Sequence, residues 1–190
     1  MKLLGFLVSG LLSGMSFAHN ADYISQTDEF GKVIYEKVVV RFEVLHPDVG
    51  LPGSYFIGIE GDHGNYYVHN KNGWGLFQGG IPDSYLDSPA LSDNLSVVLF
   101  ETPPSGQVSG QTICDRLREE TGSSQVSIWI GYGALQPEAA DRVNRYHSIA
   151  NQRLDPNHVR HVYIFNDATT GSKGANVLSF NCPPIGPSTN

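Results

Sequence analysis

The amino-acid sequence predicts a mainly β fold (α+β), an antiparallel β-sandwich of about seven strands with two helical insertions and one disulfide. Short runs of alternating apolar and polar residues, separated by Gly, Pro and Asn turn residues, predict the strands. The order of elements lacks the regular strand-helix alternation of parallel α/β folds. A chain of 190 residues is long enough for one core, so we expect a single domain.

The first eighteen residues predict a secretory signal peptide, 1–18. Lys2 supplies a positive charge, Leu3 to Met15 form an apolar run, and Ser16 and Ala18 are the small residues that a signal peptidase requires. The run is too short for a membrane-spanning helix, and no cysteine follows it to accept a lipid. We therefore expect a secreted or periplasmic protein without membrane insertion, whose mature chain begins at His19.

The charge of the chain excludes several classes of partner. The sequence holds 12 basic and 19 acidic residues, a net charge of −7, and loss of Lys2 with the leader makes the mature chain more negative. An acidic surface repels phosphate backbones and anionic lipids. We therefore expect no nucleic-acid partner.

The sequence predicts a series of strands in the first half of the mature chain. Residues 19–36 are polar and predict an N-terminal arm or an edge segment, ahead of a domain over 37–182. Alternating apolar residues predict a strand over 37–45, with Val38, Val40, Phe42 and Val44 on one face. Asn72-Gly73 predicts a hairpin with a type I′ turn, in which both residues have positive φ. Further strands are expected over residues 54–60, 66–69, 74–77 and 95–100, the first three of them as a meander, with a long loop over 79–93.

The second half adds the helices. We expect a short helix over 111–121 with Ser109 as its N-cap and Gly122 just after its end. A second helix is expected over 136–149, because Pro137 suits a first helical position. Strands are predicted over residues 125–132, 159–165 and 175–182, followed by a flexible tail over 183–190.

Cys114 and Cys182 predict a disulfide. An even pair of cysteines far apart in sequence is most simply a disulfide in an oxidising compartment. A metal-thiolate site or a nucleophilic cysteine would need nearby ligands or a base, and the sequence places none beside either residue.

Strand, turn and glycine positions recur over residues 51–58, 64–68, 72–74, 82–85 and 126–133. Together these segments resemble an uncharacterised β-rich module that is appended to bacterial secreted and surface proteins. The resemblance implies a fold and an extracellular structural or adhesive setting, and it transfers no catalytic residues. The helix over 136–149 departs from a simple sandwich.

Aromatic residues form the main candidate ligand site, made of Trp74, Tyr66, Tyr85 and Trp129. Three of them lie in the predicted meander, whereas Trp129 alternates with Ser127 and glycines on a face of the strand over 125–132. An exposed aromatic among small residues can stack on a sugar ring or on a protein. The alternative, which we favour, is that the helix over 136–149 covers Trp129.

His19 is the candidate metal ligand, because an N-terminal amine and an imidazole on one residue can chelate copper. This arrangement resembles copper-dependent polysaccharide oxygenases and small periplasmic copper carriers, but the sequence shows no matching motif around a second histidine and lacks the aromatic C-terminal pattern of the oxygenases. His158 and His161 are three residues apart, and the strand predicted there places them on opposite faces. We therefore expect no metal shared by these two residues.

No motif in the sequence carries catalysis. The adjacent carboxylates Glu119 and Glu120 read as a solvated helix face, and neither a nucleophile elbow nor a zinc-protease motif is present. The sequence therefore favours a secreted or periplasmic non-catalytic binding or structural module of the bacterial envelope or cell surface, with an envelope or surface protein or a polysaccharide as partner. Two alternatives stay open: a carbohydrate-binding module that uses exposed aromatics, and a copper protein that uses His19. Of these functions, only the copper protein would need a cofactor, which is copper.

Overall fold

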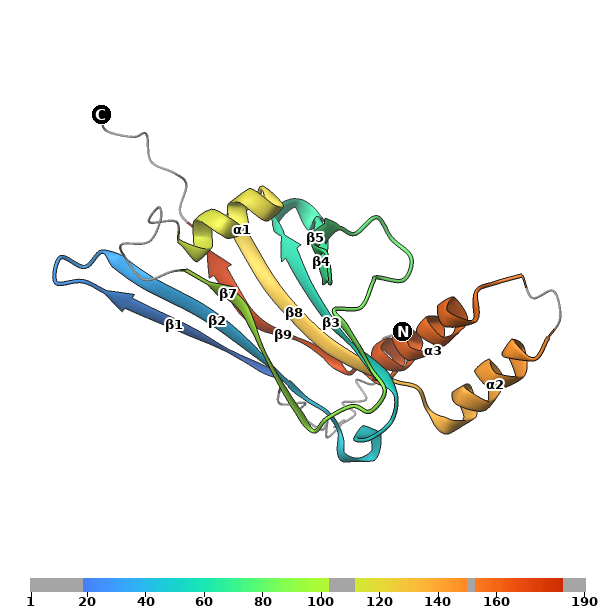
Figure 1. The fold of residues 1–190 in the computed structure, drawn as a ribbon. Coiled ribbons are helices and arrows are strands. Elements are labelled where there is room, and N and C mark those ends of the chain that lie inside the picture. Colours follow the sequence, from blue (N-terminus) through green and yellow to red (C-terminus); the bar gives the residue numbers. More distant parts are fainter. Residues whose placement is uncertain (1–18, 103–111, 150–152, 183–190) are drawn as a thin grey trace, which may run out of the picture.

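The computed structural model describes residues 19–102, 112–149 and 153–182. Within these ranges the chain forms two antiparallel sheets and three α-helices (Figure 1). The mainly β, sandwich-like fold is confirmed, with nine strands in place of the seven predicted. The predicted signal peptide 1–18, the tail 183–190 and the proposed cap Ser109 lie outside the described residues.

The smaller sheet has three strands in the order β1 (Asn20–Thr27), β2 (Val33–Glu43) and β7 (Asn94–Glu101). The β1–β2 hairpin projects from one end of the molecule (Figure 1). Residues 19–36 were predicted to form either an arm or an edge segment. The edge segment is confirmed, because β1 is the edge strand of the smaller sheet. On β2 the predicted alternation is confirmed, because Val38, Val40 and Phe42 are at most 1% exposed.

The larger sheet has the order β5 (Gly73–Leu76), β4 (Tyr66–Asn70), β3 (Gly53–Gly61), β8 (Gln125–Ala134) and β9 (Gly174–Asn181). A short strand, β6 (Leu86–Ser88), also pairs with β3. The meander β3–β4–β5 is confirmed. The prediction of a type I′ turn between β4 and β5 is wrong, because Gly73 has a positive φ, +107°, and Asn72 does not.

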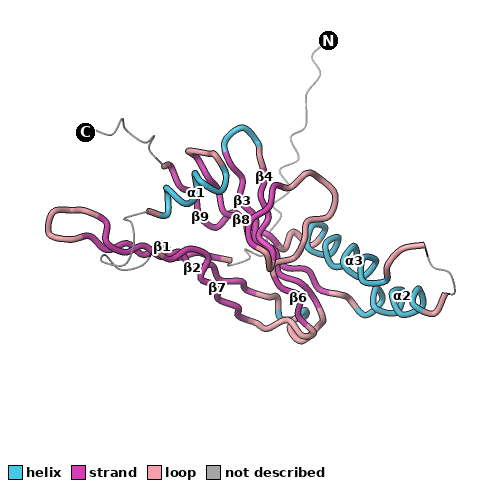
Figure 2. Tube along the Cα trace, turned by 45° about the horizontal axis from the view of Figure 1, so that its top comes forward, coloured by secondary structure: helices cyan, strands magenta, loops and turns pink. Residues whose placement is uncertain are grey.

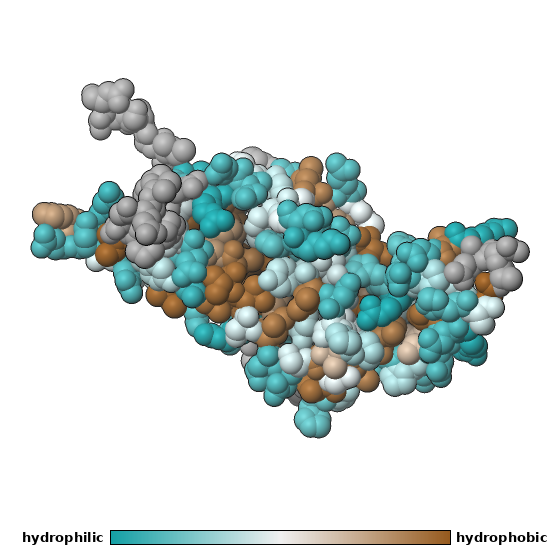
Figure 3. All heavy atoms as spheres, viewed as in Figure 1, coloured by the Kyte–Doolittle hydropathy of each residue, from teal (hydrophilic) through white to brown (hydrophobic). Residues whose placement is uncertain are grey.

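The core lies between the inward faces of the two sheets. Tyr55, Ile57 and Ile59 of β3 and the alternate residues of β8 from Val126 to Tyr132 are nearly fully buried. The rings of Phe42 and Tyr55 meet edge to face with centroids 5.0 Å apart. In the view of Figure 3, apolar residues gather around the middle of the molecule within a mostly hydrophilic surface. The opposite faces of β3 and β8 therefore point away from this core.

Helix α1 (Ile113–Thr121) corresponds to the short helix predicted over 111–121. Thr112 is its N-cap, and the side chains of Thr112 and Asp115 form a capping box. Gly122 ends the helix in a left-handed conformation, as predicted. Cys114 of α1 and Cys182 after β9 form the predicted disulfide. The disulfide therefore joins α1 to the end of the larger sheet.

The last two helices, α2 (Pro137–His147) and α3 (Pro156–Thr170), pack side by side at the end opposite the β1–β2 hairpin (Figure 2). Helix α2 was predicted. The strand predicted over 159–165 is wrong, because this segment lies inside α3. Asp155 accepts a hydrogen bond from the backbone of Asn157, and Pro156 occupies the first turn, so the chain starts a helix there. Packing on α2 and the sheet then overrides the β preference of the residues that follow.

Candidate functional site

The candidate site lies on the outer face of the larger sheet, where α3 covers only part of β3 and β8. Gly133 of β8 sits directly under α3, and a Cβ atom there would lie 2.0 Å from the Ile164 carbonyl oxygen. Gly131 is similarly close to the Lys173 backbone, at 2.8 Å. The two glycines therefore allow close approach of α3 and of the turn that follows it.

The rest of this face is open around Trp129. The indole is 42% exposed, and α2 packs against α3 at the far end of the molecule (Figure 1). The favoured expectation that the helix over 136–149 covers Trp129 is therefore wrong. The predicted alternation on β8 is correct, because Val126, Ile128 and Ile130 face the core and Trp129 faces outward.

A hollow of about 400 Å³ lies beside Trp129. Glycines of three adjacent strands, Gly58, Gly131 and Gly174, form part of its lining. Gly58 leaves the backbone of β3 open to close approach, because the only atom near a Cβ there is the Tyr67 carbonyl oxygen, at 3.4 Å. The space at Gly131 is filled by the Lys173 backbone. Apolar residues of the lining include Phe56, Val68, Pro82, Trp129, Phe165 and Ala168.

One carboxylate orients two exposed aromatic rings on this face. Trp129 Nε1 donates a hydrogen bond of 3.1 Å to Glu60 Oε2, and Tyr66 Oη donates one of 3.0 Å to Glu60 Oε1. Tyr66 is 48% exposed, and its hydrogen bond to Glu60 raises the pKa of its hydroxyl. We call Glu60, Tyr66, Trp129 and the adjacent hollow the outer-face site.

The structure separates the four aromatic residues predicted as a ligand site into two pairs. Tyr66 and Trp129 share the outer-face site. Trp74 stacks on Phe100 with ring centroids 5.9 Å apart, and the His69 ring packs against both Trp74 and Tyr85. Trp74 and Tyr85 are half-buried against the core, so they support the fold more than they present a surface.

Glu60, Phe56 and Phe165 belong to the site but were not predicted from the sequence. The alternation on β3 places Phe56, Gly58 and Glu60 on one face, and this signal was available. The missing information was that β3 pairs with β8, with Gly58 opposite Trp129. The contribution of Phe165 depends on α3 being a helix.

A second, polar hollow of about 540 Å³ neighbours the first. Asp83 lines both, and His161 Nε2 donates a hydrogen bond of 2.9 Å to the Pro82 carbonyl at their boundary. His158 and His161 line this hollow together, so the expectation of opposite faces is wrong: α3 places them one turn apart. Within the described ranges, no group of three His, Cys, Asp or Glu residues has an arrangement that could hold a metal ion.

His19 is a structural residue in this arrangement. Its side chain is buried, Nδ1 accepts a hydrogen bond of 3.0 Å from the Glu43 amide, and Nε2 donates one of 3.2 Å to the Lys173 carbonyl. Burial lowers the pKa of the imidazole, which favours the neutral ring that these two bonds require. Copper binding by His19 would have to displace one of these backbone partners.

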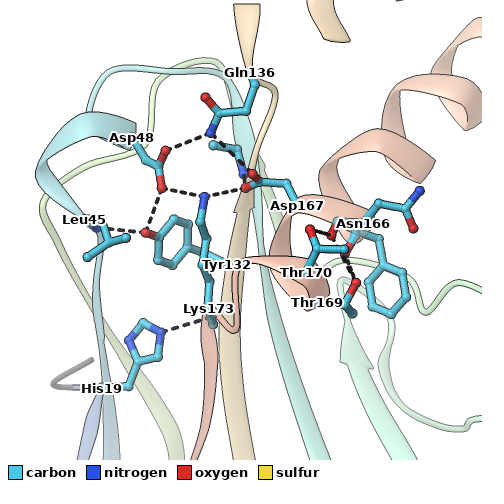
Figure 4. A network of polar contacts seen from close by, with 12 residues as sticks. His19, Leu45, Asp48, Tyr132, Gln136, Asn166, Asp167, Thr169, Thr170 and Lys173 are labelled. Atoms are coloured by element: carbon cyan, nitrogen blue, oxygen red, sulfur yellow. Dashed lines mark hydrogen bonds and ion pairs between the residues drawn. The ribbon is translucent and has the colours of Figure 1, made fainter. Parts of the chain in front are cut away.

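A buried polar network lies beneath the covered end of the sheet (Figure 4). Lys173 Nζ lies 2.7 Å from Asp48 Oδ2 and 2.6 Å from Asp167 Oδ2. Tyr132 and Gln136 donate hydrogen bonds to Asp48, and the Ala134 amide donates one to Asp167.

Burial acts to raise the pKa of Asp48, but the hydrogen bonds from Lys173, Gln136 and Tyr132 outweigh it and lower the pKa. Each charged group is thus held by several partners from other segments. The network therefore serves as a cross-link between β8, α3 and the 3₁₀ turn His46–Asp48.

Comparisons with known proteins found no matching family model, curated sequence or solved structure. The resemblance to a β-rich surface module therefore stays a prediction. Among the described helices, none combines the length and the apolar character needed to cross a membrane.

Proposed function

We propose that the protein is a secreted or periplasmic, non-catalytic binding module of the bacterial envelope or cell surface, and that it binds through the outer-face site. The observation that carries this proposal is Trp129, a large exposed aromatic held in place by Glu60 beside a preformed apolar hollow. The Cys114–Cys182 disulfide is compatible with an oxidising compartment.

Preorganisation of the aromatic rings supports a binding role. A side chain that is already fixed loses little conformational entropy when a ligand covers it. Tryptophan and tyrosine in such positions contribute most to affinity at interfaces. A hollow of about 400 Å³ with a few polar groups at its rim is also typical of a ligand site.

The arrangement of His19 does not favour the copper-binding alternative. Both of its ring nitrogens are already bonded to backbone groups. The side chain joins the end of β2 to the start of β9, which gives this residue a role in the fold.

Binding of the secreted full chain to the insoluble envelope fraction of the producing bacterium tests the proposal. We expect Trp129→Ala to weaken sedimentation with the envelopes about ten-fold. Phe30→Ala is the matched control, because Phe30 is an aromatic residue 87% exposed in the β1–β2 turn, away from the site. Equal sedimentation of Trp129→Ala and the native protein would overturn the proposal.

A further inference from the structure

We infer that the ligand of the outer-face site is a chain of neutral sugars, a polysaccharide bound along the face from Tyr66 to Trp129. This inference rests on the proposed function and names the ligand class for the same site. Three features carry it: the spacing of two aromatic rings, the hydrogen-bonding groups around them, and the charge of the surroundings.

The two rings stand on strands that are separated by β3, and their polar atoms meet at one carboxylate. Tyr66 lies on β4 and Trp129 on β8, with β3 between them, so their backbones are roughly 10 Å apart across the sheet. Glu60 binds the polar atom of each ring. The apolar C–H face of a sugar ring can then pack on the exposed part of each aromatic.

Hydrogen-bonding groups surround the aromatic rings on the same face. Ser127 of β8 pairs with Ser179 of β9, and their hydroxyl oxygens are 3.0 Å apart at the surface. Asn176 lies opposite Trp129 in the sheet register, and its amide is within 3.5 Å of the Ser179 hydroxyl. Together with the Glu60 carboxylate, these groups offer both donors and acceptors to sugar hydroxyls.

The polar hollow continues the surface of hydrogen-bonding groups beyond the apolar hollow. It adds the side chains of Asn70, Asn157 and Asp155 to the lining and shares Asp83 with the apolar hollow. Each pyranose unit has apolar C–H faces and hydroxyl-bearing edges, so one chain can place its faces against the apolar hollow and its edges against the polar groups on either side. An apolar side chain of a protein partner would use only the first hollow.

The charge of the site selects against acidic polysaccharides. Glu60 lies beside the rings, and the polar hollow has three carboxylates, Asp83, Asp87 and Asp155, against one lysine, Lys71. The nearby Lys173 is already bound to two aspartates. The whole chain carries a net charge of −7. Uronate, sulfate or phosphate groups would therefore be repelled, whereas neutral sugars meet no such penalty.

Affinity gel electrophoresis with neutral glucans and mannans in the gel, and with polygalacturonate as the acidic probe, tests the inference. We expect at least one neutral polysaccharide to retard the native protein and Phe30→Ala equally. Trp129→Ala should lose about ten-fold in affinity, and Tyr66→Ala a smaller amount. Calorimetry with oligosaccharides of the retarding polymer should show affinity that rises with chain length, because only a chain can contact the aromatic rings and the polar hollow together.

Treatment of the envelope fraction separates failure of this inference from failure of the proposed function. Loss of Trp129-dependent sedimentation after periodate oxidation of the envelopes supports a sugar ligand. Loss after protease treatment, with periodate without effect, shows a protein ligand and overturns the inference while the proposed function stands. Retardation by polygalacturonate alone overturns the assignment to neutral sugars. Sedimentation that does not depend on Trp129 overturns both proposals.

Discussion

The two ends of the outer face of β3 and β8 both contain glycine, but one is covered by α3 and the turn after it and the other is open. At one end, α3 lies on Gly133, and the turn after α3 lies on Gly131. At the other end, Gly58 and Trp129 lie opposite each other in the register and nothing in the described residues covers the indole fully. Glycine on a sheet thus makes room at both ends, for a helix at one and for the proposed ligand at the other.

The covered end is held by groups that are buried and fully partnered, whereas the open end is held by two surface hydrogen bonds. Lys173 is 6% exposed and lies between two carboxylates. Glu60 and its two aromatic partners lie at the surface. The covered end should therefore govern the free energy of unfolding, and the open end should govern binding.

Lys173→Met tests the covered end and should have the largest effect. Removing the ammonium leaves the buried carboxylates of Asp48 and Asp167 without their cation, which costs roughly 3 to 5 kcal/mol of unfolding free energy. Urea titration followed by circular dichroism measures it. Lys71→Met, in the exposed β4–β5 turn, is the control and should change stability by less than about 0.5 kcal/mol. Equal effects of the two substitutions would show that the network is no cross-link.

Gly133→Ala and Gly58→Ala compare the same substitution at the two ends. A Cβ at Gly133 meets the Ile164 carbonyl at 2.0 Å, so α3 must shift, at a cost of roughly 1 to 3 kcal/mol or more. A Cβ at Gly58 has only the Tyr67 carbonyl nearby, at 3.4 Å, and should cost less than about 1 kcal/mol. Thermal and urea unfolding of both variants gives the comparison. A larger loss for Gly58→Ala would reverse the assignment of the two ends.

Local pattern was enough to predict the faces of single strands but not their neighbours. The alternation from Val126 to Tyr132 correctly placed Trp129 outward, because a strand has a period of two wherever it pairs. The pairing of β3 with β8 joins residues about seventy positions apart, and no local signal encodes such a contact. Glu60 could therefore not be linked to Trp129 from the sequence.

The error in α3 has a definite physical cause. The residues from Val159 to Phe165 are mostly β-branched or aromatic, which favours a strand in isolation. The cap at Asp155 and the proline after it are helix-start signals, and they decided the outcome together with packing of Ile164 on the sheet. The same error hid the shared position of His158 and His161 and the part that Phe165 plays in the hollow.

Acid should weaken the covered end in a way that depends on Asp48. The lowered pKa of Asp48 means that its contribution to stability is fully present above its unfolded value of 3.8 and is lost as the pH falls through the lower, folded pKa. The unfolding free energy of the native protein should therefore decrease below about pH 4. Asp48→Asn should be less stable at neutral pH and should lose less on acidification.

Asp62 supplies a second carboxylate for comparison beyond the open end. Hydrogen bonds from the Ser124 backbone and from neighbouring serine side chains lower the pKa of Asp62 to about 2. Asp62→Asn should therefore remove its own share of the acid dependence and leave that of Asp48 in place. Acid titration of the native protein, both single variants and the double variant measures the two shares. An unchanged profile in Asp48→Asn would show that this network is not the acid-sensitive element.

Trp129→Ala should have the smallest effect on stability, although it should have the largest effect on binding. The indole is 42% exposed, and its hydrogen bond to Glu60 lies at the surface, so we expect a loss of less than about 1 kcal/mol. Trp74→Ala is the matched comparison, because Trp74 stacks on Phe100 against the core and its removal should cost roughly 3 kcal/mol or more. Urea titration of the two variants measures the difference. A loss at Trp129 as large as that at Trp74 would mean that the open end also holds the fold together, and weaker binding by Trp129→Ala would then report unfolding in place of a lost ligand contact.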